Sequence, residues 1–207
     1  MTPVRPSKII GIGRNYRAHA EELGNPMPAQ PIIFLKPPTA VIGNGETIIL
    51  PRESQRVEQE AEIGVVVLER LKDVSREQAE RVRLGYTCVN DVTARDLQKV
   101  DGQWGRAKGF DSFCPMGPVV AEGVDWRSLE IIGRVNGKEV QRGKATDMAF
   151  DIPTLLVFIT RVMTLEPGDL IATGTPAGTT VLRPGDVSEV EIPGVGVLRN
   201  PVAERAG

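Results

Sequence analysis

The chain has 207 residues, of which 41% are hydrophobic and 25% charged, and its formal net charge is -2. This length and composition predict one globular domain with a sizeable core and exclude a disordered chain. Lys and Arg are scattered rather than gathered in a basic stripe, so a nucleic-acid partner is disfavoured. No apolar stretch is long enough to span a membrane and the N-terminus lacks signal-peptide features, so we expect a cytoplasmic protein with no membrane partner.

Short apolar segments divided by turn residues follow one another along the chain. They cover 7–13, 32–37, 40–43, 46–50, 62–69, 85–91, 117–122, 130–140, 169–174, 187–192 and 196–202. Many short strands of this kind predict a mainly β architecture. Asn136-Gly137 stands between alternating residues and predicts a hairpin with a type I′ turn.

Helical patterns are fewer, and they cover 16–24, 75–85, 93–100 and 151–169. Ser75 is placed as an N-cap with Gln78 at the capping-box position, which predicts a short surface helix. The last segment has Pro153 in its first turn and apolar residues at helical spacing, and Pro167-Gly168 stops it. We expect its apolar stripe to pack on the sheet.

The cysteines and the histidine limit the chemistry. Cys88 and Cys114 form neither a CxxC pair nor a disulfide framework, and His19 is the only histidine. A Cys/His zinc site is therefore improbable, and we expect both cysteines to be buried free thiols.

Two acids precede a strongly apolar run in "RVEQEAEIGVVVLE", residues 56–69. Side chains alternate across a strand, so Glu60 and Glu62 share one face at the point where the strand becomes buried. Burying unpaired carboxylates costs several kcal/mol, so they need a cation, protons or water. The alternative is that the strand begins in solvent and both acids are hydrated.

Asp91 supplies a third acid at the end of the strand-like segment 85–91. If it converges with Glu60 and Glu62, a hard divalent cation would neutralise the group, and Mg²⁺ is our first choice with Mn²⁺ or Ca²⁺ as alternatives. Three carboxylates would leave coordination positions open for water or substrate, as a catalytic metal requires.

Further side chains have both a functional and a surface interpretation. His19 and Glu22 are three residues apart, so on a helical turn the carboxylate could orient the imidazole as a base, or both could be ordinary surface groups. Arg95 and Gln98 share a helical face with Asp91 and could bind an anionic substrate, or they form a solvated face.

Two segments near turns have the same two interpretations. Lys108 in "GRAKGF" is either a surface lysine or a cation that faces a substrate carboxylate. The turn "TGTPAG", residues 173–178, follows a strand, and its hydroxyls and N–H groups could bind an oxyanion.

The segments "GRNYRAHAEELG", "PIIFLKPPTAVIG", "VEQEAEIGVVV", "NDVTARDLQ", "AKGFDSFCPMGP" and "LIATGTPAGT" occur in an order and spacing that resemble the fumarylacetoacetate hydrolase (FAH) family. The resemblance covers nearly the whole chain and is strongest to short members similar to acylpyruvate hydrolases and oxaloacetate decarboxylases. It implies an α+β, mainly β fold, a mixed β-sandwich roll with few helices, and a homodimer. It also implies a single catalytic domain over 1–207, with a lid dyad in 1–50 and a metal-binding core in 51–207. The separate N-terminal β-barrel domain of larger fumarylacetoacetases is missing, which puts fumarylacetoacetate itself in doubt as the substrate.

The resemblance also implies roles for particular residues. The implied ligands of Mg²⁺ or Mn²⁺ are Glu60, Glu62 and Asp91. The implied contacts of the substrate's oxo-acid and carboxylate oxygens are Arg95, Gln98, Lys108 and Thr175. His19 and Glu22 would form a dyad on a mobile lid that activates water.

These inferences lead to a hydrolase that cleaves a C–C bond in a small 2,4-dioxo acid of the acylpyruvate type. The metal would stabilise the enolate that leaves, His19 would take a proton from the attacking water, and Lys108 would offset negative charge or assist protonation. The alternatives at the same site are an oxaloacetate decarboxylase and a 2-hydroxyhepta-2,4-diene-1,7-dioate isomerase. A protein that binds a divalent cation without catalysis is less favoured, because a purely structural site has no need of Arg95 and Lys108.

Overall fold

The computed structural model describes residues 6–205. Its strands are β1 (Ile9–Gly13), β2 (Ile32–Lys36), β3 (Val41–Ile42), β4 (Ile48–Leu50), β5 (Val57–Gln59), β6 (Ala61–Val67), β7 (Leu84–Asn90), β8 (Thr93–Ala94), β9 (Cys114–Glu122), β10 (Glu130–Val135), β11 (Lys138–Lys144), β12 (Leu170–Ala172), β13 (Thr180–Val181), β14 (Val187–Ile192) and β15 (Gly196–Glu204). Its α-helices are α1 (Arg17–Glu22), α2 (Arg76–Ala79), α3 (Arg95–Asp101), α4 (Gly105–Gly109) and α5 (Ile152–Val162).

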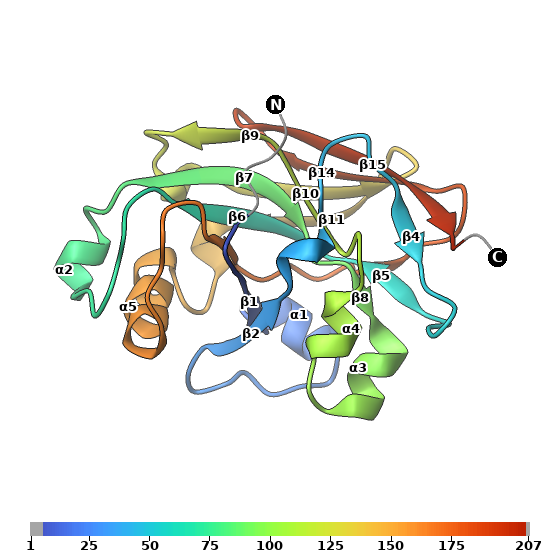
Figure 1. Ribbon diagram of the computed structural model, residues 1–207, viewed down its shortest axis with the longest axis horizontal. Helices are drawn as coiled ribbons and strands as arrows, with labels where there is room; N and C mark the ends of the chain where they lie inside the picture. Colours follow the sequence, from blue (N-terminus) through green and yellow to red (C-terminus); the bar gives the residue numbers. More distant parts are fainter. Residues whose placement is uncertain (1–5, 206–207) are drawn as a thin grey trace.

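The strands form three sheets, which Figure 1 shows as a curled β layer with helices along one side. The largest sheet has the order β2-β1-β12-β6-β7-β9-β3, the second β11-β10-β14-β15-β4, and the third β13-β5-β8. Parallel and antiparallel neighbours occur in the first two sheets, as β1 runs parallel to β12 and β4 parallel to β15. The fold is therefore the mixed, mainly β roll with few helices that the sequence predicts.

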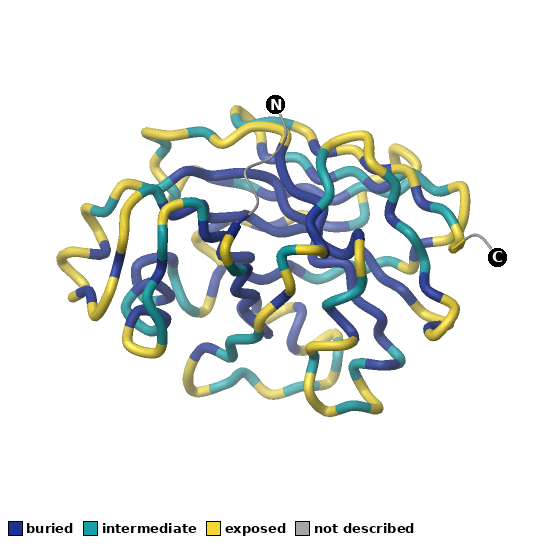
Figure 2. The backbone as a smooth tube through the Cα atoms, viewed as in Figure 1, coloured by how far each residue is buried: buried dark blue, intermediate teal, exposed yellow. Residues whose placement is uncertain are grey.

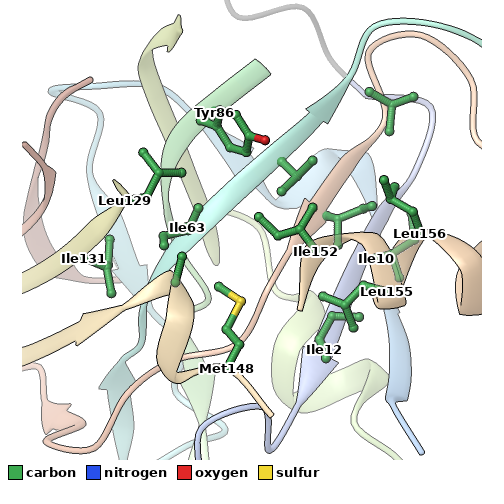
Figure 3. Packing of buried hydrophobic residues seen from close by; sticks show 14 of the residues in the cluster. Ile10, Ile12, Ile63, Tyr86, Leu129, Ile131, Met148, Ile152, Leu155 and Leu156 are labelled. Atoms are coloured by element: carbon green, nitrogen blue, oxygen red, sulfur yellow. The ribbon is translucent and has the colours of Figure 1, made fainter. Parts of the chain in front are cut away.

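The main hydrophobic core lies between the largest sheet, the second sheet and α5 (Figure 3). Ile63 of β6 and Leu155 and Leu156 of α5 are among its buried residues, and Figure 3 shows the two leucines close to Ile10 of β1. Every residue of β6 is buried, because Glu62, Gly64 and Val66 on the other strand face are covered as well. Figure 2 shows this burial as a continuous dark band through the central strands, with exposed residues at the loops and outer helices.

Several local predictions are confirmed. The turn at Asn136-Gly137 joins β10 to β11, with φ of 53° and 76° at the two residues, as a type I′ turn requires. Ser75 accepts the N–H of Gln78, and the Gln78 side chain accepts the N–H of Ser75, so the capping box is present. Cys88 and Cys114 are buried free thiols, and burial raises the pKa of each to about 12.

Two helices are shorter than the sequence predicts. The helix expected over 75–85 ends at Ala79, because the chain from Leu84 onward is taken into β7. The helix expected over 151–169 ends at Val162, and Leu165 then pairs with Leu71 in an isolated bridge. Conversely, α4 has no helical pattern in its sequence "GRAKG" and is found only in the structure. Among residues 6–205, no helix has the length and apolar character needed to cross a membrane.

Candidate active site

The candidate site lies where the chain passes from the smallest sheet to the largest, between β5 and β6. β5 pairs with β8 and β13 in the smallest sheet, whereas β6 pairs with β7 and β12 in the largest, and Glu60 lies between them. At this break two buried amide side chains replace backbone partners. The N–H of Glu60 donates to Asn90 Oδ1 at 3.0 Å, and the N–H of Ala61 donates to Gln141 Oε1 at 3.0 Å. The break is thus fixed by side-chain hydrogen bonds that satisfy both of these buried backbone N–H groups.

The three predicted acids converge at this break. Asp91 follows β7, and its N–H donates to the carbonyl oxygen of Glu60 at 2.9 Å. One oxygen from each of Glu60, Glu62 and Asp91 lies within 4.8 Å of the others. Since Glu60 is 4% exposed and Glu62 1% exposed, the alternative that both acids are hydrated at a strand entrance is wrong.

Buried cations surround the acids. Lys108 of α4 lies between two of them, with Nζ at 2.6 Å from Glu60 Oε2 and 2.5 Å from Asp91 Oδ2. Lys36 of β2 is 1% exposed and donates to the other oxygen of Asp91. Arg95, the first residue of α3, donates to Glu60 and to Glu58, the latter at 2.8 Å.

The charges give the two glutamates opposite protonation behaviour. Burial alone would raise the pKa of Glu60, but Lys108 and Arg95 outweigh it and hold that pKa well below its usual range. The pKa of Glu62 is raised well above its usual range by burial, by Asp91 and by Glu60. Glu62 is therefore the acid whose charge the surrounding protein compensates least, although Gly174 donates its N–H to Glu62 Oε2 at 2.8 Å.

This donor set fits a hard divalent cation. Its ligand atoms are all carboxylate oxygens, which Mg²⁺ and Mn²⁺ prefer, and they are close enough to meet on one ion. A cation beside Glu62 would also remove the cost of its buried charge. Glu60, Glu62 and Asp91 are thus the residues that could hold a metal here.

The predicted dyad lies against the same space. His19 is on α1 and is 5% exposed, and its Nδ1 is 3.3 Å from Glu22 Oε2. Glu22 in turn accepts the N–H of Gly178 at 3.1 Å. The imidazole is therefore buried and oriented by an acid, and the alternative of two ordinary surface groups is wrong for His19.

Gln98 and Thr175 are already engaged by protein groups. Gln98 Oε1 accepts Arg95 Nη1 at 2.7 Å, so its amide N–H₂ is directed elsewhere. The Thr175 hydroxyl donates to the carbonyl oxygen of Ala61 at 2.9 Å and accepts Gln141 Nε2 at 2.7 Å. Because its single proton is used, this hydroxyl can only accept a further hydrogen bond from a substrate.

One cavity of about 450 Å³ brings the predicted residues together. It is lined by His19, Glu22, Glu60, Glu62, Arg95, Gln98, Lys108 and Thr175, and by neighbours that the sequence did not indicate. Asp91 is not among the lining residues and is buried next to Lys108. A volume of this size suits a small organic ligand.

Sequence reasoning did not find the supporting residues. Glu58 stands at the same alternate spacing as Glu60 and Glu62 in "VEQEAE". This third acid could have predicted a buried cationic partner, which the structure shows to be Arg95. Gln141 and Asn90 carried no such signal, because an amide in a strand is common and their partners lie 80 and 30 residues away.

The chain is similar to known proteins over nearly its whole length. Residues 8–203 match the family described as "Fumarylacetoacetate (FAA) hydrolase C-terminal". The chain is 42% identical over 189 residues to a mitochondrial oxaloacetate tautomerase of Caenorhabditis elegans, covering 88% of each chain. It is 38% identical over 195 residues to a mitochondrial oxaloacetate decarboxylase of Dictyostelium discoideum, covering 91% of this chain and 89% of that one. A crystal structure of a 2-hydroxyhepta-2,4-diene-1,7-dioate isomerase from Mycobacterium marinum superimposes with a TM-score of 0.90 at 43% identity, covering 100% of this chain and 78% of that chain.

Proposed function

We propose that this chain, which belongs to the fumarylacetoacetate hydrolase family of enzymes, acts on a 2-oxo acid that has a second carbonyl carbon at position 4. The reaction would pass through the enolate of this acid. Oxaloacetate and the acylpyruvates both have this skeleton. The observation that carries the proposal is that His19 and the acids Glu60 and Glu62 line one cavity. A base and a cation-binding group that line the same small cavity are what enolate chemistry needs.

The proposed metal ligands are Glu60, Glu62 and Asp91. A bound Mg²⁺ or Mn²⁺ would supply Lewis-acid stabilisation of negative charge on the substrate oxygens. Lys108 and Arg95 would add positive charge at the same end of the cavity, and Arg95 is held in place by Glu58. These cations would bind and orient the carboxylate next to the oxo group.

His19 is the proposed proton carrier. Its Nδ1 faces Glu22, so Nε2 is the ring nitrogen left to exchange a proton with a ligand in the cavity. Glu22 would fix the tautomer and stabilise the imidazolium, as a carboxylate does beside a catalytic histidine. Removing a proton from carbon 3 and delivering one to the oxo oxygen would convert the keto form to the enol, and the reverse transfers would restore the keto form.

The relatives named for oxaloacetate favour tautomerisation or decarboxylation of oxaloacetate as the reaction. Hydrolysis of an acylpyruvate C–C bond is the second candidate. It is favoured by the buried pair of His19 and Glu22, which could deprotonate a water as well as a carbon. All three reactions pass through an enolate that the metal would stabilise, and only hydrolysis needs an attacking water.

The test is a substrate comparison on one preparation. Purified protein with Mg²⁺ or Mn²⁺ is assayed for enol–keto interconversion of oxaloacetate, for loss of CO₂ from it, and for cleavage of acetopyruvate. Each assay is repeated after exhaustive chelation. We expect metal-dependent turnover of at least one substrate, and turnover that survives chelation undiminished contradicts the proposal.

A further inference from the structure

Arg14 has a backbone conformation that its side chain does not favour. It lies between β1 and α1 with φ of 54°, in the left-handed region that Gly and Asn adopt most easily. The next residue holds the turn rigidly, because Asn15 accepts the N–H of Phe150 at 2.8 Å and donates to the carbonyl oxygen of Thr173 at 2.8 Å. An arginine kept in such a position points to a role for its side chain, because strain of this kind gathers at functional sites.

Most cations that line the cavity are already paired. Arg95 and Lys108 pair with Glu60, and Arg56 pairs with the buried Glu58. Arg14 lines the same cavity and is half-buried, yet its side chain makes no hydrogen bond or ion pair with any residue in 6–205. Lys99, exposed at the rim, also has no such partner within those residues. Positive charge is therefore left over at this part of the cavity.

The neighbourhood of Arg14 indicates an organic anion. Trp104 lines the cavity and lies over the backbone of Gly13, where an added Cβ would come within 2.4 Å of its ring. Ile12 and Leu23 line the cavity as well. An apolar wall beside an unpaired guanidinium suits a short carbon chain that ends in a carboxylate, which Arg can bind through two hydrogen bonds.

We propose that Arg14 binds the second carboxylate of a dicarboxylic 2-oxo acid, and so selects such substrates over 2-oxo acids whose far end is uncharged. This inference rests on the function proposed above and names its substrate class. The first carboxylate and the oxo group occupy the end near Glu60 and Lys108, and the second carboxylate lies at Arg14.

The test compares oxaloacetate with its 4-monomethyl ester, which has the same skeleton with the far charge masked. For each we measure kcat/KM with saturating Mg²⁺, and calorimetric binding as a readout that needs no turnover. The variants are Arg14→Asn, which suits the left-handed backbone, and Arg14→Lys, which keeps the charge. Arg161→Gln is the matched control, because it removes an exposed arginine of α5 that does not line the cavity.

We expect the wild type to prefer the free acid, and Arg14→Asn to reduce this preference about 10- to 100-fold, the usual worth of a hydrogen bond to a charged group. Arg14→Lys should restore part of the preference, and Arg161→Gln should leave it unchanged. The melting temperature of Arg14→Asn should equal or exceed that of the wild type, so the loss is not one of folding. A preference that survives in Arg14→Asn overturns the inference. The wild type could also bind both ligands without turning over either of them. If Arg14→Asn then loses the binding preference for the free acid, Arg14 is supported as the carboxylate site and only the proposed reaction is overturned.

Discussion

The carboxylate of Glu22 accepts the backbone N–H of Gly178, 156 residues further along the chain, with both oxygens at 3.1 Å from the nitrogen. Only glycine fits at position 178, because its φ is +98° and a Cβ there would lie 2.0 Å from the carbonyl oxygen of Val140. A short helix, α1, is therefore tied to the loop after β12 through the same acid that orients His19. Glu22 has two partners, and a substitution must be judged against both.

The dyad gives the first prediction. His19→Ala should lower kcat about 100- to 10,000-fold, the usual contribution of a positioned base. Glu22→Gln should have a smaller effect, because the amide oxygen can still accept one hydrogen bond but no longer carries charge. Turnover is measured with saturating Mg²⁺. Glu21→Gln, which changes an exposed neighbour on the same helix, is the control and should retain the wild-type rate. A His19→Ala enzyme as fast as the wild type would mean that another group moves the proton.

The acid cluster gives the second prediction. Glu60→Gln, Glu62→Gln and Asp91→Asn should each reduce turnover to background, because each removes a ligand of the proposed metal. Without metal, however, Glu62→Gln should unfold at a higher temperature than the wild type, because burial and two neighbouring acids raise the pKa of Glu62 and disfavour its charge. If removal of this unfavourable charge stabilises the folded state by about 1 kcal/mol, the melting temperature should rise by about 2–4 °C. Thermal unfolding in chelator measures it, and a lower melting temperature contradicts the electrostatic argument.

The amide that supports the break before β6 gives the third prediction. Gln141→Leu would leave the Ala61 N–H without its acceptor and the Thr175 hydroxyl and the Pro176 carbonyl oxygen without their donor. Each buried unpaired group costs about 1–3 kcal/mol, so the three losses together should lower the free energy of unfolding by about 3 kcal/mol or more. Urea unfolding measures the change. The exposed Gln103→Leu is the control and should stay within about 0.5 kcal/mol of the wild type. Equal stability of the two variants would show that the buried amide is dispensable.

Asp151 gives the fourth prediction, which concerns pH. It caps α5 through the N–H of Thr154 at 2.9 Å and pairs with Arg76 at 2.7 Å. Burial opposes its charge, but the hydrogen bonds from Arg76 and Thr154 prevail and lower its pKa to about 2. A lowered pKa in the folded state means stabilisation that is present above the unfolded pKa, about 3.9, and is lost as the pH falls towards 2.

Asp151→Asn isolates that charge, because Asn is an equally good N-cap. The variant should be less stable than the wild type by about 1 kcal/mol at pH 7, and the difference should disappear between about pH 4 and pH 2. Denaturant unfolding across this range is the measurement. A difference that is constant with pH would mean that packing of the side chain, and not its charge, is responsible.

The sequence predicted what depends on local pattern. Alternating apolar residues predicted most strands, and Glu60, Glu62 and Asp91 could be singled out as candidates because charge beside a buried strand is unusual. The resemblance to a known family added the roles of Arg95 and Lys108, which the residues alone left open. The homodimer that it implies stays a prediction.

What the sequence could not predict depends on contacts between distant segments. Gln141 lies in a different sheet from Ala61, and nothing in "KEVQRGK" sets it apart from a solvated strand residue. The end of α5 at Val162 likewise results from the pairing of Leu165 with Leu71, which overrides a continuing helical pattern. The hydrogen bond from the Thr175 hydroxyl to the carbonyl oxygen of Ala61 joins residues that are 114 positions apart, so only the folded structure reveals it.

The passage of one strand from the smallest sheet to the largest at Glu60 also governs when the site exists. Glu62 and Asp91 come together only when β6 has paired with β7, so a partly folded molecule has the right residues but no cluster. Binding competence should therefore appear in a single late step of refolding, and a newly made chain would not capture ions before its architecture is complete.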